Sequence, residues 1–179
     1  EDLCDLAVRG LDELIDYQDY PIIAAEIATK ARRSLGVGYI GLAHYLARQG
    51  HYYSDPEALT SIHQLTEAFQ YYLVKASIDL AKEKGPCRDY LQTKYGQGLM
   101  PVDHYKKEVD SICDTELQYD WDALREEVKY HGIRNSTLTA QMPSESSSVV
   151  CNATNGVEPP RDYLSVKVSK KGTLKQIVP

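Results

Sequence analysis

Residues 136–160 read STLTAQMPSESSSVVCNATNGVEPP, and this stretch says more about the fold than any other in the chain. It opens with the β-leaning residues 136–139 and, after Met142-Pro143, continues into the serine-rich segment 144–148. The pattern predicts a strand, a hydroxyl-rich turn and then the start of a helix. The first N–H groups of a helix lack partners inside it and lie at the positive end of its dipole, so this turn can hold a phosphate group.

The composition places this turn in an acidic globular chain. The 179 residues are 42% hydrophobic, which is enough for one sizeable core. The formal net charge of -6 gives no general attraction for nucleic acid or an anionic membrane, so we expect neither as a partner. No apolar run approaches the roughly 18 residues of a membrane span, and Glu1-Asp2 does not open a secretion signal. These features predict a cytoplasmic protein.

We expect both ends of the chain to be cut. The sequence lacks an initiator methionine, and it stops at Pro179 directly after a segment with the pattern of a strand. Residues 1–179 are therefore predicted to be part of one domain of a longer protein.

The cysteines and histidines do not form a metal or redox signature. The five histidines lack HxxxH or HExxH spacing, and the cysteines are too far apart for a CxxC pair. We expect reduced, individually placed thiols and no metal site. The four cysteines are Cys4, Cys87, Cys113 and Cys151.

Helical patterns dominate the first three quarters of the chain. Apolar spacing predicts helices over 3–17 and 24–33, and a longer helix of about 28 residues ends before Gly85-Pro86. Asp120 is predicted to cap a compact helix that Gly132 closes. Residues 87–116 are expected to be irregular. Residues 164–168 and 174–177 predict a β-hairpin that turns at 170–172.

Two motifs suggest functions that their contexts do not support. Residues 36–41, GVGYIG, match the dinucleotide-binding GxGxxG, but no apolar strand precedes them, so we expect these glycines to let a helix pack closely. Tyr71-Tyr72 could suggest electron transfer. Adjacent helix positions face different ways, so we expect one core ring and one ring at the rim.

Six strings along the chain resemble the large (alpha) subunit of class I, aerobic ribonucleotide reductases. The resemblance covers essentially all 179 residues, and the pairing of MPSESSS with NATNGVEPP is its most specific part. The strings are IDYQDYP at 15–21, RRSLGVGYIGLAHYLARQG at 32–50, YYLVKAS at 71–77, YDWDALRE at 119–126, HGIRNSTLTAQMPSESSS at 131–148 and NATNGVEPPRDYLSVKVSKKGTLKQIVP at 152–179.

The resemblance implies both a fold and a role for the serine turn. The fold class is α/β: a mostly helical part of the ten-stranded α/β barrel of this family, with a C-terminal β-hairpin. In the family, the proline and the next four residues bind the diphosphate of the substrate, largely through backbone N–H groups. The matching substrate-binding residues here are Pro143, Ser144, Glu145, Ser146 and Ser147. We expect the Glu145 side chain to point away from the anion while its amide contributes.

The resemblance also implies a reaction and its partners. The family reduces ribonucleoside diphosphates to deoxyribonucleoside diphosphates for DNA synthesis, with a cysteine thiyl radical and a reducing cysteine pair. The implied partners are a radical-generating small (beta) subunit, thioredoxin or glutaredoxin, and a second large subunit. The metal-radical cofactor would lie in the small subunit, and the ATP and deoxynucleotide effector sites would lie elsewhere in the large subunit.

This stretch departs from the family pattern in its catalytic groups. It contains no Asn-x-Cys-x-Glu motif, and no cysteine falls on a matching catalytic position, so we expect no catalytic residue here and no activity from the chain alone. Tyr71-Tyr72 is not the family's radical-relay pair. Two alternatives stay open: a non-catalytic interaction module that docks a partner on the apolar stripe from Leu59 to Leu80, and a nicotinamide-binding domain built on residues 36–41.

Overall fold

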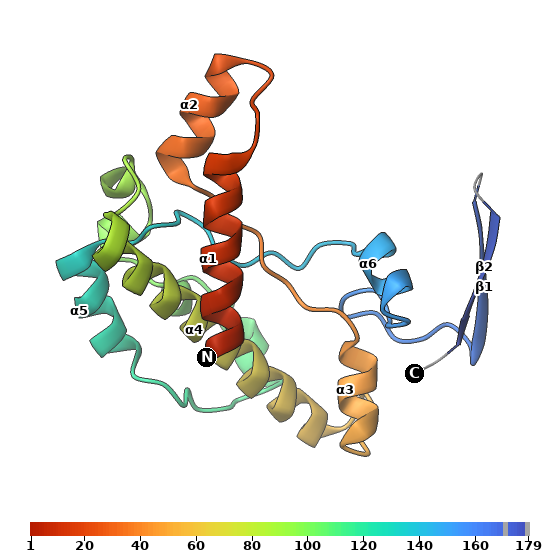
Figure 1. The fold of residues 1–179 in the computed structure, drawn as a ribbon. Helices are drawn as coiled ribbons and strands as arrows, with labels where there is room; N and C mark the ends of the chain where they lie inside the picture. The colour runs from red at the N-terminus through yellow and green to blue at the C-terminus, as the bar shows by residue number, and fades with distance from the viewer. Residues whose placement is uncertain (170–171, 178–179) are drawn as a thin grey trace. The chain divides into compact units, whose positions relative to one another are not determined.

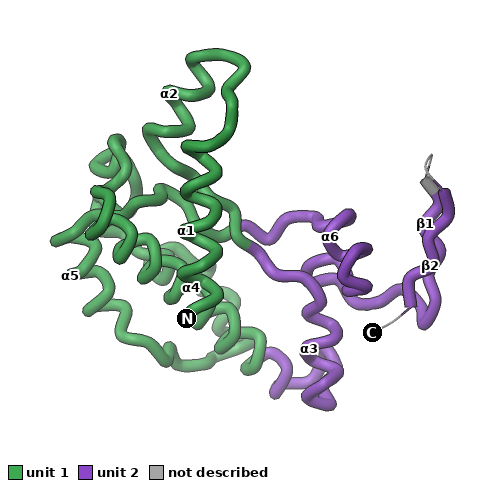
Figure 2. The backbone as a smooth tube through the Cα atoms, viewed as in Figure 1, with its two compact units in different colours: residues 1–37, 60–139 green, residues 38–59, 140–179 purple. Residues whose placement is uncertain are grey.

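The computed structural model describes residues 1–169 and 172–177. Within them lie six α-helices, four short 3-10 helices and a two-stranded antiparallel sheet (Figure 1). The chain forms two compact units (Figure 2). The first comprises Glu1–Val37 and Thr60–Thr139, and the second comprises Gly38–Leu59 and Ala140–Pro179.

The first unit is helical, as its sequence predicts. α1 ends where the chain becomes extended at Gln18, ahead of Pro21. α2 ends at Arg33, whose backbone is left-handed with φ 49° and whose N–H donates to the Thr29 carbonyl. The long helix α4 has 29 residues, about 44 Å at the standard rise. The helices are α1 (Asp2–Tyr17), α2 (Ile23–Arg32), α4 (Pro56–Lys84) and α5 (Trp121–His131).

The C-terminal half of α4 is buried on more than the predicted stripe. Leu73 and Leu80 belong to that stripe and are buried, but Val74, Ser77 and Ile78 are buried too. The reason is that several segments pack around this half. α1 runs beside it in the same direction, held by the ion pairs Lys75–Glu1 (2.8 Å) and Arg9–Glu83 (2.6 Å), and residues 133–138 cover another side.

Glu67 and Asp120 fix the start of α5. The Asp120 carboxylate accepts the Ala123 N–H at 2.8 Å, which confirms the predicted cap. The buried Glu67 side chain on α4 accepts from the backbone N–H of Gln118 and from the Trp121 indole N–H, at 2.9 and 3.1 Å. These bonds tie the loop before α5 to the long helix.

Residues 87–116 are irregular, as predicted. They contain four 3-10 helices, and Arg125 of α5 helps to hold the third of them by an ion pair with Asp103 at 2.6 Å. The 3-10 helices are η1 (Tyr90–Gln92), η2 (Tyr95–Gln97), η3 (Pro101–Asp103) and η4 (Lys107–Ser111).

The core of the first unit combines an apolar cluster with a buried polar network. Leu73, Trp121 and Val128 pack in the cluster with residues from α1 and from segment 133–138. Beside it, the fully buried Asp12 accepts from the Arg33 Nε at 2.6 Å and from the Asn135 amide at 2.9 Å. The network links α1, the end of α2 and the segment that leads to the serine turn.

The prediction of a strand at residues 136–139 is wrong. Leu35 donates to the Thr137 carbonyl and Val37 donates to the Leu138 carbonyl, but this pairing gives only one isolated parallel bridge, Val37 with Thr139. A parallel pair is stable only inside a larger sheet, and no other strand flanks it among the described residues.

The glycine motif at 36–41 lies outside any helix, so the expected helix packing is wrong as well. Helix α2 and its left-handed cap Arg33 precede it, not the strand that a dinucleotide site requires. Gly38 nevertheless permits a close approach, because a Cβ there would lie 2.3 Å from the Ala140 carbonyl oxygen. Gly41, with φ 74°, is the N-cap of the helix α3, which begins at Leu42.

The second unit contains two short helices and the predicted hairpin. In the hairpin Leu164 pairs with Ile177 and Ser169 pairs with Gly172, while the predicted turn residues 170–171 lie outside the described residues. Its apolar side chains Leu164 and Val166 are about half exposed. The elements are α3 (Leu42–Arg48), α6 (Glu145–Val150), β1 (Leu164–Ser169) and β2 (Gly172–Ile177).

Candidate functional site

The serine turn is the start of α6, as predicted. Ser144 is the N-cap, with non-helical φ −114° and ψ 46°, and the six-residue helix begins at Glu145. Ser144 and Ser148 are buried, whereas Pro143, Ser146 and Ser147 are exposed. The five residues that the family resemblance singles out therefore lie together on one helix start.

The two buried serines anchor the turn at both ends. The Ser144 N–H and hydroxyl both donate to the Asn155 side-chain oxygen, at 2.6 and 2.9 Å. The Ser148 N–H donates to the Ser144 carbonyl at 2.8 Å, which closes the first helical turn. The first turn of α6 is thus held in place from a second loop.

Between the two anchors, backbone donors stay free. The N–H groups of Glu145, Ser146 and Ser147 have no hydrogen-bond partner among the described residues. Three successive N–H groups at a helix start form a concave donor surface that suits an anion. Pro143 has no N–H, so its part in such a site is limited to shaping the chain.

The loop that carries Asn155 is itself held in place by backbone hydrogen bonds. On either side of Asn155, the Thr154 carbonyl accepts the Gly41 N–H at 3.0 Å and the Gly156 carbonyl accepts the Leu42 N–H at 3.3 Å. Gly156 has φ 55°, and a Cβ there would lie 2.9 Å from the Gln141 amide nitrogen. The left-handed backbone at this position of NATNG favours glycine, whereas the contact with the end of the flexible Gln141 side chain could be relieved by a small shift.

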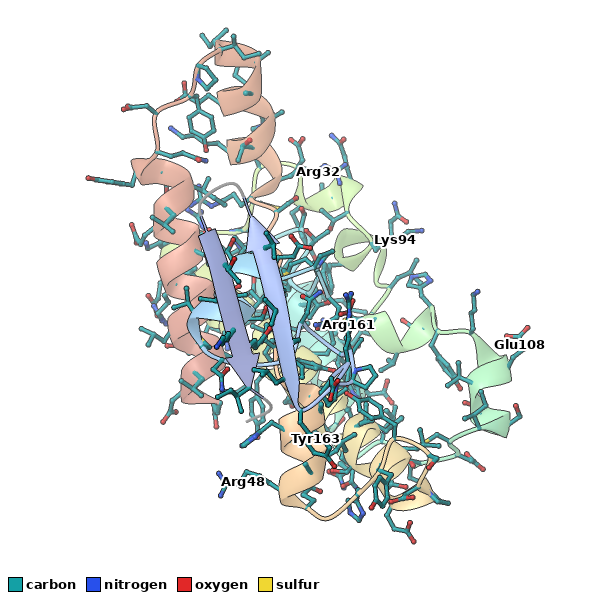
Figure 3. The ribbon with its side chains drawn as sticks, turned by 90° about the vertical axis from the view of Figure 1, so that its right-hand side faces the viewer. Arg32, Arg48, Lys94, Glu108, Arg161 and Tyr163 are labelled. Carbon is teal, nitrogen blue, oxygen red and sulfur yellow. The ribbon has the colours of Figure 1, made fainter. Side chains whose placement is uncertain are left out.

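Charged side chains near the turn are of mixed sign. A cavity of about 250 Å³ lies between the turn and the hairpin, and Arg161 and Lys167 line it together with Glu145, Glu158 and Asp162. Arg161 lies just ahead of β1 (Figure 3). Since carboxylates accompany both cations, the charged side chains around the cavity carry no net positive charge that would attract an anion.

The cysteines lie apart and none forms a disulfide. Burial raises the pKa of the Cys4 thiol, and burial followed by the nearby Asp89 carboxylate raises the pKa of Cys87. Both are therefore protonated and poorly nucleophilic near neutral pH. Cys151, which follows α6, is exposed.

The tyrosine pair belongs to an aromatic cluster. Tyr71 stacks on Tyr119 with ring centroids 4.6 Å apart, and it meets Tyr72 and Trp121 edge-on at 5.6 and 5.4 Å. Both tyrosines are half-buried, so the predicted division into one core ring and one rim ring is wrong. The cluster packs α4 against the start of α5.

The described residues contain neither a candidate metal cluster nor a membrane-spanning helix. No group of three or more His, Cys, Asp or Glu side chains in this part of the chain could hold a metal ion. No helix that the structure describes is long and apolar enough to cross a membrane.

A comparison with known protein families places the chain in one of them. It matches the ribonucleotide reductase barrel domain over residues 1–179 and belongs to that family. This agrees with the resemblance stated from the sequence strings.

Curated relatives are alpha subunits of ribonucleoside-diphosphate reductase. The one from Haemophilus influenzae is 56% identical over 173 residues, which are 97% of this chain and 23% of the relative. Subunit alpha of reductase 1 from Escherichia coli is 56% identical over 92% of this chain and 22% of its own length. The phage T4 relative is 52% identical over 99% of this chain and 23% of its own length. The chain spans about a quarter of the length of these relatives.

Sequence reasoning missed Asn155 as a part of the site. NATNGVEPP is distinctive as a string, but nothing in it indicates that the second asparagine bonds Ser144, 11 residues earlier. That link exists only once the two loops are folded against each other.

Proposed function

We propose that this chain is part of the large subunit of a ribonucleoside-diphosphate reductase, an oxidoreductase that converts ribonucleoside diphosphates to deoxyribonucleoside diphosphates. Within it, Pro143, Ser144, Glu145, Ser146 and Ser147 form the loop that binds the substrate diphosphate. Family membership over residues 1–179 and the names of the relatives support this assignment.

The observation that carries the loop's role is the set of three free N–H groups at Glu145, Ser146 and Ser147. Hydrogen bonds from N–H groups to a charged phosphate are about twice as strong as neutral ones. Exposed backbone donors also bind the diphosphate that all ribonucleotide substrates share, without reading the base. The Glu145 side chain is exposed, so it is free to point away from the bound anion.

The proposal extends to the whole enzyme. The complete domain is the ten-stranded α/β barrel, and the partners are a second large subunit, a small subunit and thioredoxin or glutaredoxin. The metal-radical cofactor belongs to the small subunit, and the ATP and deoxynucleotide effectors bind elsewhere in the large subunit. The four free cysteines support a reducing compartment, the cytoplasm.

Ser146 offers a matched test of backbone recognition in a full-length large subunit that contains this chain. Ser146→Pro removes one of the free N–H groups, whereas Ser146→Ala removes only the hydroxyl. We expect the proline variant to raise KM for the diphosphate substrate by about tenfold, the value of one charge-assisted hydrogen bond, and the alanine variant to leave KM within about twofold.

Steady-state kinetics with the small subunit present measure both variants. An unchanged KM in Ser146→Pro contradicts backbone recognition, and an equal rise in Ser146→Ala assigns the contact to the hydroxyl. Circular dichroism of both variants controls for folding, because proline in a first helical turn breaks no intrahelical bond.

The interaction-module alternative loses its main support. The stripe on α4 that would dock a partner includes Leu73, Ala76 and Leu80, and these side chains are buried within the first unit. They are therefore used by the fold itself.

A further inference from the structure

Ser144 does not cap α6 in the usual way. An N-cap serine normally accepts an N–H of the second or third helical residue with its own hydroxyl oxygen. Here Ser144 makes no such bond; its hydroxyl donates to the Asn155 Oδ1 at 2.9 Å, and its N–H donates to the same oxygen at 2.6 Å. One asparagine oxygen thus takes both donors of the capping residue.

We propose that Asn155 is a positioning residue for diphosphate binding, because it holds the Ser144 hydroxyl away from the helix and keeps the N–H groups of residues 145–147 free. This inference rests on the proposed function of the serine loop, which the family resemblance implies. Asn155 itself need not touch the substrate.

The Ser144 hydroxyl oxygen and the phosphate can accept from the same backbone N–H groups, so they compete for them. Without Asn155, the Ser144 hydroxyl is free to rotate and accept from Ser146 or Ser147, since serine is a favoured N-cap. Such self-capping occupies an N–H group that the phosphate needs. The helix gains a cap of its own while the anion site loses a donor.

Asn155 is suited to this task because its own place is rigid. Its backbone carbonyl accepts the Glu158 N–H at 2.9 Å, and the carbonyls of Thr154 and Gly156 are bonded to the start of α3. A further bond joins the Ala153 N–H to the Ser148 carbonyl at 2.8 Å, at the other anchor of the turn. The side-chain oxygen of Asn155 is therefore held at a set distance from Ser144.

The test uses four variants of a full-length large subunit that contains this chain, assayed with its small subunit. They are Asn155→Ala, Ser144→Ala, the double variant Ser144→Ala with Asn155→Ala, and Asn152→Gly as the matched control. Asn152 is exposed, its side chain makes no hydrogen bond with the described residues, and its backbone φ of 48° suits glycine.

Asn155→Ala should raise KM for the ribonucleoside diphosphate about tenfold while kcat stays within about twofold, because a ground-state phosphate contact is lost. Inorganic pyrophosphate, used as a competitor, should lose affinity in parallel. Asn152→Gly should leave KM near the parent value, and Ser144→Ala gives the reference KM for the double variant. The double variant should recover most of the loss, because it lacks the hydroxyl that blocks the site.

Recovery in the double variant separates positioning from general loosening of the loop. If the double variant is as impaired as Asn155→Ala, or if Asn155→Ala leaves KM unchanged, the inference is overturned. Ser146→Pro in the same assay separates the two proposals: an unchanged KM there removes the proposed function as well, whereas a raised KM confines the failure to Asn155. If Asn155→Ala does not fold, Asn155→Ser, whose side chain is too short to reach Ser144, replaces it in the same comparison.

Discussion

Arg33 shows how one residue can hold several segments together. Its guanidinium bonds Asp12 at 2.6 Å and Asp16 at 2.7 Å, and its left-handed backbone ends α2. Burial raises the pKa of Asp12, but Arg33 and Arg134 more than offset this and hold that pKa below its usual value. The buried carboxylate therefore stays ionised near neutral pH and depends on its cations.

Arg33→Ala should destabilise the protein by about 3–5 kcal/mol, because it leaves the Asp12 carboxylate buried with only part of its compensation. Urea unfolding followed by circular dichroism measures the loss. The neighbouring Arg32 is exposed and serves as the control (Figure 3). Arg32→Ala should change the unfolding free energy by no more than about 0.5 kcal/mol. Similar losses in the two variants would show that the buried pair is not the cause.

At the serine turn, the helix start could be predicted from the sequence, but the bond between Asn155 and Ser144 could not. Ser144 and its neighbours were predicted as a helix start with free donors, since hydroxyl-rich caps have a local signature. The role of Asn155 was not predicted, because its bond to Ser144 depends on the path of the chain between them.

At the scale of elements, an ion pair joins the turn η3 to helix α5. The Arg125 guanidinium forms two bonds to the Asp103 carboxylate, at 2.6 and 3.0 Å, and the Met100 N–H donates to it at 2.7 Å. Arg125, followed by the Met100 N–H, lowers the pKa of Asp103 to about 2. The ordinary value is 3.8, so the folded state binds this proton less readily than the unfolded chain.

This pKa shift predicts a pH dependence of stability. Above about pH 5 the carboxylate is ionised in both states and its contribution is fully present; as pH falls toward about 2, the unfolded chain takes up the proton first and the contribution is lost. The difference in unfolding free energy between the parent and Asp103→Asn should be largest above pH 5 and shrink toward pH 2. Arg125→Gln should lose the same pH-dependent part, and a difference that stays constant with pH would contradict the assignment.

Other elements show where local patterns succeed and where they fail. The helix at Trp121–His131 was predicted with both ends correct, because Asp120 and Gly132 carry their own cap signals. Residues 136–139 have the composition of a strand, yet they form one bridge. A strand exists only if neighbours pair with it, and local composition does not specify neighbours.

At the scale of the whole molecule, the chain holds a proposed binding loop without an identified catalytic thiol. Cys4 and Cys87 are buried with raised pKa values, and no cysteine falls in the motif of the family's radical residue. The 179-residue polypeptide should therefore give no deoxyribonucleotide when it is mixed with a small subunit, a thiol reductant and a ribonucleoside diphosphate. A full-length relative provides the positive control, and product above a blank without the chain would contradict this expectation.

The sequence by itself determined the family, the helix over 3–17, the long helix that ends before Gly85, the helix between Asp120 and Gly132, the hairpin and the serine turn. Apolar periodicity, caps, turn residues and motif strings act over short distances along the chain, so they can be read without a fold. The tertiary structure alone decided which partners meet: Asp12 with Arg33, 21 residues away, and Ser144 with Asn155, 11 residues away. A hydrogen bond requires its atoms within about 3 Å, and only the packed chain sets such distances between separate segments.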